Sequence, residues 1–131
     1  MDCPDCGAAT LSVPLSDADR ERLPEDAPGV AVCTRCLRVD PITDPPADCP
    51  DLSSISDAFP PAPEHARTVI CLLALLDQIA LYRGDIDALV ERAEAEGTDV
   101  MLVLDRLAAD ERVAPHFDLE KRTHQLRQLL R

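Results

Sequence analysis

The amino-acid sequence predicts an α+β fold, in which a small N-terminal unit of short antiparallel strands is joined to a C-terminal bundle of about four α-helices. Two Cys-x-x-Cys pairs occur among short apolar runs in residues 1–42, six prolines crowd residues 43–63, and apolar residues recur at helical spacing in residues 64–131. Because composition changes at these boundaries, we expect an N-terminal domain over 1–42, a linker over 43–63 and a helical domain over 64–131.

Short strands are expected beside the cysteine pairs. Residues 11–13 alternate apolar and polar side chains, and residues 30–32 and 37–39 are short runs that contain β-branched valines. Both patterns are typical of strands. Between the first two strands, residues 16–19 resemble a capping box with Asp in place of Glu. This box should open one or two turns of helix, which Pro24 interrupts.

The proline-rich segment is expected to be an extended tether. Proline cannot donate a hydrogen bond to a strand ladder, and it pushes the preceding residue toward extended geometry. Residues 43–63 should therefore form a semi-rigid linker, which can also lie along one of the domains.

Residues that favour the starts and ends of helices divide the last region into four helices, expected near 64–83, 86–96, 99–110 and 118–131. Proline suits the first position of a helix, glycine suits the left-handed residue after its end, and Asp or Thr suits the N-cap. The residues in these roles are Pro63 as a first position, Gly84 and Gly97 as caps after helix ends, and Asp85, Thr98 or Asp99, and Asp118 as N-caps.

The first of these helices is expected to form the core. Its apolar residues in the range 69–81 spread around almost the whole circumference, which is typical of a buried helix. The three later helices each offer one apolar face and should pack around it, with Leu76 in the core. Because three short helices give limited cover, we also expect that a homodimer can form through 69–82. Asp77 is expected to pair with an arginine of a neighbouring helix or to face solvent, rather than to act as a buried functional acid.

The two cysteine pairs predict a metal site. Cys3 and Cys6 form the first pair and Cys33 and Cys36 the second, with 26 residues between them. This spacing suits one tetrahedral Zn²⁺ ion, whose sulfur ligands lie about 2.3 Å from the metal. Because four sulfurs leave no open position for a substrate, we expect one structural zinc ion. A redox dithiol, and cysteines that bind another metal or none, are the alternatives.

Neighbouring residues support this interpretation. Gly7 follows the first pair directly, so backbone N–H groups can fold toward the thiolates. Arg35 and Arg38 beside the second pair can offset part of the negative charge of a four-thiolate site. A unit of about 40 residues buries little apolar surface, so it should need the metal in order to fold.

These residues resemble a zinc ribbon. The opening Cys3-Pro4-Asp5-Cys6-Gly7 and the second motif Cys33-Thr34-Arg35-Cys36 match that broad class over residues 3–40. The whole layout is also similar to a small uncharacterised haloarchaeal family with an N-terminal ribbon and a helical C-terminal half. The resemblance implies the fold, and it implies no activity.

The remaining cysteines and the histidines lie outside this pattern. Cys49 is expected to be a plain loop cysteine, with a surface thiol or an alternate ligand as the other interpretation. Cys71 is expected to be a small buried hydrophobe. His65, His116 and His124 share no metal-ligand spacing, so they are expected to be ordinary surface or helix-end histidines.

The charge balance bears on the class of partner. The chain has 25 acidic and 13 basic residues, a net charge of −12, and Lys121 is its only lysine. Such a surface repels phosphate backbones, so nucleic-acid binding is not favoured, although molar salt would screen these charges. The acid excess and the preference for Arg over Lys are similar to the cytoplasmic proteins of salt-accumulating halophiles.

A cytoplasmic location without membrane association is expected. The chain opens with Met1-Asp2-Cys3, an acidic start that does not resemble a signal peptide. The apolar run 69–82 is shorter than the roughly 20 residues that cross a bilayer. Cytoplasmic thiols stay reduced, which favours metal ligands over disulfides.

The expected function is non-enzymatic. The sequence has no phosphate-cradling Gly-rich loop, no His-Glu-x-x-His motif and no nucleophile elbow. We expect a zinc-binding adaptor or regulatory protein that acts through protein–protein interaction. A nucleic-acid-binding transcriptional regulator is the alternative, for which Lys121, Arg127 and Arg131 on the last helix would supply a basic face, and a thiol-redox protein ranks third.

Overall fold

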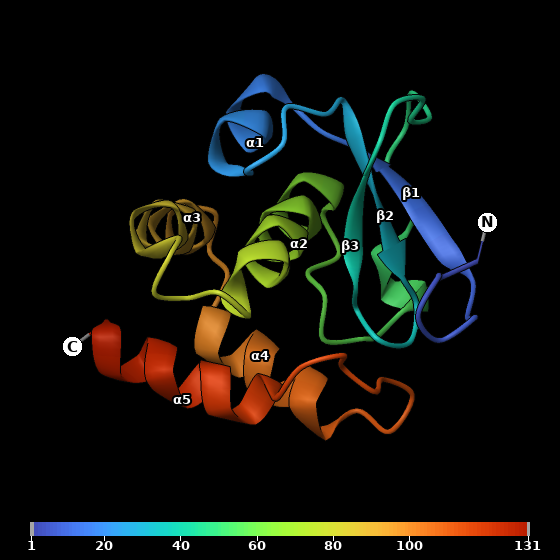
Figure 1. Ribbon diagram of the computed structural model, residues 1–131. Helices are drawn as coiled ribbons and strands as arrows, with labels where there is room; N and C mark the ends of the chain where they lie inside the picture. Colours follow the sequence, from blue (N-terminus) through green and yellow to red (C-terminus); the bar gives the residue numbers. More distant parts are fainter. Residues whose placement is uncertain (1, 131) are drawn as a thin grey trace.

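The computed structural model describes residues 2–130, and in it a three-stranded sheet packs against helices (Figure 1). The strands are β1 (Thr10–Pro14), β2 (Gly29–Cys33) and β3 (Val39–Ile42), which are antiparallel and lie in the order β1-β2-β3. The α-helices are α1 (Asp17–Arg22), α2 (Pro63–Leu76), α3 (Arg83–Ala95), α4 (Val100–Ala109) and α5 (Leu119–Leu129), with a 3-10 helix at Leu52–Ser54. The predicted α+β fold class is confirmed.

The sheet contains two of the three predicted strands as expected. Residues 11–13 lie in β1 and residues 30–32 in β2, with Leu11 opposite Val32. The third prediction is wrong at its start, because β3 begins at Val39. Leu37 has a φ of 63°, and this left-handed conformation is incompatible with an extended strand. The chain therefore turns back after the second cysteine pair before strand pairing resumes.

Helix α1 begins at the predicted capping box. Ser16 Oγ accepts a hydrogen bond from the Asp19 N–H at 3.2 Å, and the Asp19 carboxylate accepts one from the Ser16 N–H at 3.0 Å. These bonds satisfy donors that a helix start leaves unpaired. The helix ends at Arg22, two residues before Pro24, as expected.

The carboxylate of Asp19 also anchors α1 to the other helices. It lies 2.7 Å from Nη2 of Arg92 on α3 and 3.5 Å from Nε of Arg67 on α2. The side chain of Asp19 is only 4% exposed. A buried carboxylate is stable when charge-assisted hydrogen bonds replace its lost hydration, and here Arg92 and the Ser16 N–H donate them, while Arg67 adds a second positive charge.

Helix α2 is shorter than predicted and ends at Leu76. Beyond it, the N–H groups of Gln78 and Leu81 bond to carbonyls three residues earlier, so residues 77–82 form turns rather than a further helical turn. This turn buries Ile79 and leaves Leu81 71% exposed. The expectation that Leu81 belongs to a buried helix is therefore wrong.

Helix α3 starts earlier than predicted, at Arg83. Gly84 lies in its first turn without a positive φ, so it is not a cap after α2, and Asp85 is not an N-cap. Gly97 does cap the end of α3, with a φ of 88°. The N–H of Gly97 bonds to the Glu94 carbonyl at 3.0 Å and that of Thr98 to the Ala93 carbonyl at 2.9 Å, which is the Schellman arrangement.

The last two helices match their predictions closely. Asp99 caps α4 by accepting the Leu102 N–H at 3.1 Å, and Asp118 caps α5 by accepting the Lys121 N–H at 3.0 Å. Pro63 takes the first turn of α2, as expected. The predicted extension of the last helix to Arg131 lies outside the described residues.

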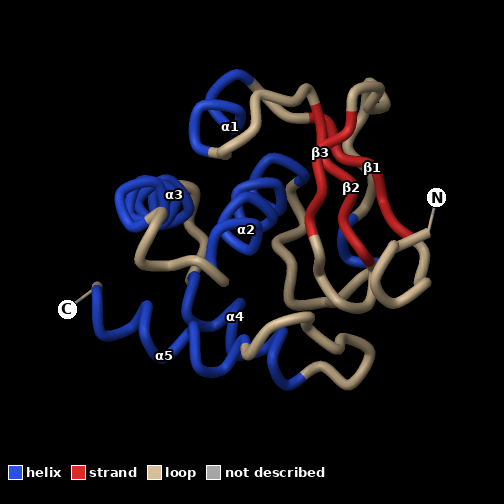
Figure 2. The backbone as a smooth tube through the Cα atoms, in the orientation of Figure 1, coloured by secondary structure: helices blue, strands red, loops and turns tan. Residues whose placement is uncertain are grey.

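One continuous cluster of buried side chains connects the sheet, the helices and the segment between them. Helix α2 lies between the sheet and α3, and Leu76 is completely buried (Figures 1 and 2). Residues 43–63 lie against the sheet at Gly29, where an added Cβ would come within 2.5 Å of Pro45 Cβ. They also place four side chains in the cluster, namely Leu52, Ile55, Ala58 and Phe59. The division of the chain into three domains stays a prediction, as does a homodimer.

No helix within residues 2–130 has the length and the apolarity that crossing a membrane requires.

Candidate metal centre

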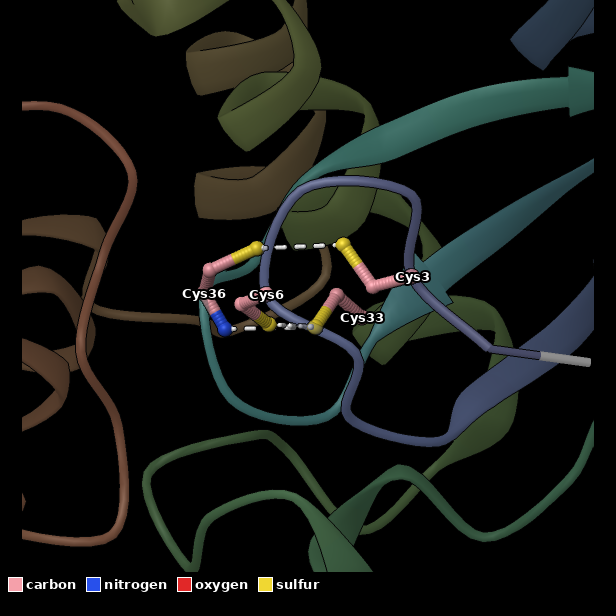
Figure 3. A group of neighbouring side chains, drawn as sticks. All are labelled: Cys3, Cys6, Cys33 and Cys36. Atoms are coloured by element: carbon pink, nitrogen blue, oxygen red, sulfur yellow. Dashed lines mark hydrogen bonds between the residues drawn. The ribbon is translucent and has the colours of Figure 1, made fainter.

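Two turns bring the four predicted cysteines together at one end of the sheet (Figure 3). The first knuckle, residues 3–8, precedes β1, and the second knuckle, residues 33–38, connects β2 to β3. All four sulfur atoms lie within 4.8 Å of one another, and this group could hold a metal ion. Cys3, Cys33 and Cys36 are buried, whereas Cys6 is exposed.

The sulfur–sulfur distances fit a tetrahedral four-sulfur site. Sγ of Cys3 lies 3.6 Å from Sγ of Cys36, and Sγ of Cys6 lies 3.4 Å from Sγ of Cys33. A tetrahedron with metal–sulfur bonds of about 2.3 Å has edges of roughly 3.8 Å. A disulfide would need about 2.0 Å, and all four cysteines are free.

The two knuckles repeat the same backbone hydrogen bonds. The Cys3 N–H bonds to the Ala8 carbonyl at 2.8 Å, and the Cys33 N–H bonds to the Arg38 carbonyl at 2.9 Å. Within each knuckle the residue after the second cysteine donates back to the first, from Gly7 to Cys3 at 3.0 Å and from Leu37 to Cys33 at 3.3 Å. The repeated turn explains why both pairs point their sulfurs to one centre.

Backbone N–H groups surround the sulfur of Cys33. The N–H groups of Arg35 and Cys36 lie 3.4 Å and 3.3 Å from this Sγ atom. Such N–H donors spread the charge of a metal-bound thiolate and fix its orientation. Backbone N–H groups at the sulfurs were expected at the first pair, beside Gly7. They are present at Cys33 of the second pair, and the Cys6 N–H bonds to the Cys3 sulfur in the first.

The pKa values of Cys3, Cys33 and Cys36 are shifted in different directions. A hydrogen bond from the Cys6 backbone lowers the pKa of Cys3 to about 7. Burial raises the pKa of Cys33 and of Cys36. A metal ion binds thiolates, so its charge would have to drive the protons off these two buried thiols.

Arg38 connects the two knuckles electrostatically. Its guanidinium pairs with Asp5 of the first knuckle and lies 2.8 Å from the Asp40 carboxylate on β3. Hydrogen bonds to Asp40 and Asp5 raise the pKa of Arg38. The predicted positive charge beside the second pair is therefore present, and it is shared with two carboxylates.

The C-terminal half contacts the second knuckle through its backbone. The N–H of Ala114 bonds to the Arg35 carbonyl at 2.7 Å, and the N–H of His116 bonds to the Cys36 carbonyl at 2.9 Å. Neither contact was predicted from the sequence. No signal could have found them, because backbone donors at a separation of about 80 residues leave no mark on composition or spacing.

One family model matches the amino-acid sequence of the chain. Residues 2–130 match the family model described as a family of unknown function (DUF6276). The chain belongs to the DUF6276 family. No curated protein and no solved structure matches it. The prediction that the chain belongs to an uncharacterised family is therefore confirmed.

The other two cysteines of this DUF6276 protein lie outside the four-sulfur group. Cys71 on α2 is fully buried, as predicted, and burial raises its pKa to about 12. Cys49 is partly buried in the loop before the 3-10 helix, and burial raises its pKa as well. Neither cysteine belongs to the metal-binding group found among residues 2–130.

The histidines and Asp77 of this DUF6276 protein lie outside the four-cysteine group found among the described residues. His65, His116 and His124 do not join the metal-binding group within the described chain. The His116 ring instead meets the Phe117 ring edge-on at a centroid distance of 4.9 Å. Asp77 is 47% exposed and lies 3.7 Å from Arg122 of α5, so the predicted pairing with a neighbouring helix is confirmed.

The basic face predicted on the last helix is partly neutralised. Arg127 Nη2 lies 3.1 Å from the Asp105 carboxylate on α4. Lys121 is exposed on the first turn of α5. Arg131, the third residue of this predicted face, lies outside the described residues.

Proposed function

We propose that this DUF6276 protein is a non-enzymatic zinc-binding adaptor, in which Cys3, Cys6, Cys33 and Cys36 hold one structural Zn²⁺ ion. The observation that carries the proposal is the four-sulfur group itself, with all four atoms within 4.8 Å of one another. Four protein ligands fill the tetrahedral coordination of zinc, and thiolates select soft or borderline metals such as zinc over Mg²⁺ or Ca²⁺.

The bound ion would act as a cross-link and supply no chemistry to a substrate. It would tie together the segment before β1 and the turn after β2, which the pairing of β1 with β2 already brings close to each other. The pairing of Arg38 with Asp5 supports the same closure of the two knuckles. Because a closed site has no position for a water or substrate, the function should lie on the protein surface.

Two features support a protein partner over a nucleic acid. The net charge of −12 favours a basic partner surface. On α5, Arg127 is paired with Asp105 of α4, and Arg122 is paired with Asp77 just after α2. These pairs reduce the positive potential that phosphate contacts need, so the nucleic-acid alternative ranks second and thiol-redox chemistry third.

The proposed setting is the cytoplasm, where thiols stay reduced, and the acid excess suits a high-salt interior. The partner can be another protein or a second copy of this chain. Its surface would contact the helices or the sheet rather than the sulfurs, since three of the four cysteines are buried.

The test is affinity capture with the zinc-loaded chain in low and in molar salt, before and after nuclease treatment. We expect one protein to be retained in both salts and after nuclease treatment. Binding of labelled duplex DNA that weakens steeply with salt, and further in Arg127→Ala, would instead establish the nucleic-acid alternative. Glu94→Ala, an exposed charge change on α3, serves as the matched control.

A further inference from the structure

The loop between α4 and α5, residues 110–118, is docked onto the second knuckle. Two of its N–H groups, from Ala114 and His116, donate to the consecutive carbonyls of Arg35 and Cys36 at 2.7 Å and 2.9 Å. In Figure 1 the loop leaves α4, extends toward the cysteine end of the sheet and returns to α5. The helical half is therefore fastened directly to the segment that carries two of the four sulfurs.

A single peptide group joins a cysteine sulfur to this loop. The group between Arg35 and Cys36 points its N–H at Sγ of Cys33, 3.3 Å away, and its carbonyl at the N–H of Ala114. A trans peptide is planar, and its N–H and C=O point in opposite directions and cannot turn independently. Any movement of this peptide caused by the Cys33 sulfur therefore also moves the Arg35 carbonyl, which accepts the hydrogen bond from the Ala114 N–H.

The ends of the loop have anchors that do not involve the knuckle. The Asp110 carboxylate accepts the Ser56 hydroxyl at 2.6 Å, and Asp118 caps α5. Val113 is buried and its N–H bonds to the Asp110 carbonyl at 3.1 Å. The middle of the loop, residues 114–117, is thus the part whose polar contacts depend most on the knuckle.

We infer that a metal ion at the four cysteines locks residues 114–117 onto the second knuckle, and that loss of the metal releases them. The inference rests on the metal centre of the proposed function and adds a regulated surface to it. A metal-bound thiolate at Cys33 is a charged acceptor, which strengthens the N–H bond of the Arg35–Cys36 peptide and polarises its carbonyl. Without the ion the knuckle loses its cross-link, and the carbonyls of Arg35 and Cys36 lose their fixed positions.

The consequence is a surface whose shape reports the metal state. The released segment holds the His116 and Phe117 rings and leads directly into α5. Helix α5 presents Arg122 and Arg127 toward the acids Asp77 and Asp105. A partner that binds at the start of α5 would therefore distinguish the metal-loaded chain from the metal-free chain.

Amide hydrogen exchange of the full chain, with and without metal, tests the inference. Metal content is measured on both samples. We expect the amides of Ala114 and His116 to exchange at least about tenfold faster without metal, which corresponds to about 1.4 kcal/mol, while amides in α2 stay protected. Equal protection of the two amides in both samples would overturn the inference. Loss of protection throughout α2 would overturn it as well, because metal loss would then unfold the whole chain.

A reciprocal test uses two proline variants of the holo protein. If the metal stabilises the loop contact, the contact must stabilise the metal by the same factor. Ala114→Pro removes the donor to Arg35, and Ala114 precedes Pro115, so its backbone favours the extended region that suits proline. The control is Glu111→Pro. The N–H of Glu111 makes no hydrogen bond within the described chain, and the backbone of the preceding Asp110 is extended.

In equilibrium competition with a chelator, we expect Ala114→Pro to bind the metal about two- to tenfold more weakly than the parent, because it removes one of the two hydrogen bonds of the contact. Glu111→Pro should bind the metal as tightly as the parent. Equal affinities in all three proteins would overturn the coupling while leaving the metal centre intact. A chain that contains no metal at all would overturn the metal centre itself, so the two failures are distinguishable.

Discussion

Leu37 occupies in the second knuckle the position that Gly7 occupies in the first, and both have a positive φ, 63° for Leu37 and 77° for Gly7. Glycine adopts this conformation freely, whereas a residue with a Cβ is disfavoured there by roughly 1–2 kcal/mol. Leu37 is nevertheless completely buried in the core. Its buried side chain offsets the backbone cost and fixes the second knuckle to the rest of the fold.

Because φ is positive at Leu37, we predict that glycine destabilises this position less than alanine does, which is the reverse of the order in a helix. Leu37→Ala should lose about 2–5 kcal/mol of unfolding free energy, because it leaves a cavity and keeps the unfavourable φ. Leu37→Gly should be about 1 kcal/mol less destabilising than Leu37→Ala, because glycine removes the strain. Denaturant unfolding of both variants checks the order.

The matched control is Leu104 in α4, which is also completely buried. In a helix glycine is worse than alanine by about 1 kcal/mol, so Leu104→Gly should be the less stable variant of that pair. The same order at both positions would contradict the role given to the left-handed backbone at Leu37.

The two glycines Gly7 and Gly84 predict opposite effects of one added methyl group. A Cβ at either position would meet no atom within 4 Å, so backbone conformation alone decides the outcome. Gly7→Ala should destabilise the protein by about 1 kcal/mol because φ is positive there. Gly84→Ala should stabilise it by up to about 1 kcal/mol, because Gly84 lies in the first turn of α3. Thermal unfolding of the two variants checks this prediction. Midpoint shifts of the same sign in both variants would contradict it.

Much of the fold could be predicted because its signals are local. The Cys-x-x-Cys pairs, the capping box at Ser16 and the N-caps at Asp99 and Asp118 each depend on residues a few positions apart, and all lie where expected. The end of α2 could not be predicted. Residues 77–82 contain neither proline nor glycine, and tertiary packing decides that Ile79 is buried and Leu81 exposed.

The rest of the candidate site depends on contacts between distant residues. The docking of Ala114 and His116 uses backbone donors, which every non-proline residue has, so no residue type marks it. Leu37 gave no signal either, because leucine seldom adopts a positive φ. Asp19 was recognisable as a capping residue, but its pairing with Arg67 and Arg92 follows only from how three helices meet.

We predict that replacing the Asp19 carboxylate by an amide strongly destabilises the fold. Asp19→Asn should destabilise the fold by about 3 kcal/mol, because Arg92 and Arg67 would lose the carboxylate that balances them in a largely buried place. Asp17→Asn, on the same helix but exposed, should change stability by less than about 0.5 kcal/mol. Similar denaturation midpoints for the two variants would show that the buried pairs contribute little.

We predict that Asp110 makes the stability of the fold depend on pH in the acidic range. Hydrogen bonds from Arg112 and Ser56 lower the pKa of Asp110. A carboxyl whose pKa is lower in the folded chain contributes stability above its unfolded pKa of about 3.9, and loses it as pH falls through that value toward the folded one. Asp110→Asn should therefore lower stability at neutral pH and flatten its decline below about pH 4.

Unfolding measured from about pH 2 to pH 6 checks this prediction. The control is Asp57→Asn, since Asp57 is 82% exposed and lies 3.9 Å from the same arginine. The variant with Asn at 57 should keep the acid sensitivity of the parent. A decline in Asp110→Asn as steep as that of the parent would show that another group is responsible.

The most direct test of the metal centre is the metal content of the folded chain, measured by plasma mass spectrometry together with a count of alkylated cysteines. One zinc per chain is expected, with the partly buried Cys49 the only one of the six cysteines to be alkylated, and slowly because its pKa is raised. Added chelator should then make Cys3, Cys6, Cys33 and Cys36 reactive. A folded chain that carries no metal, and whose Cys3 and Cys6 react without chelator, would contradict the account.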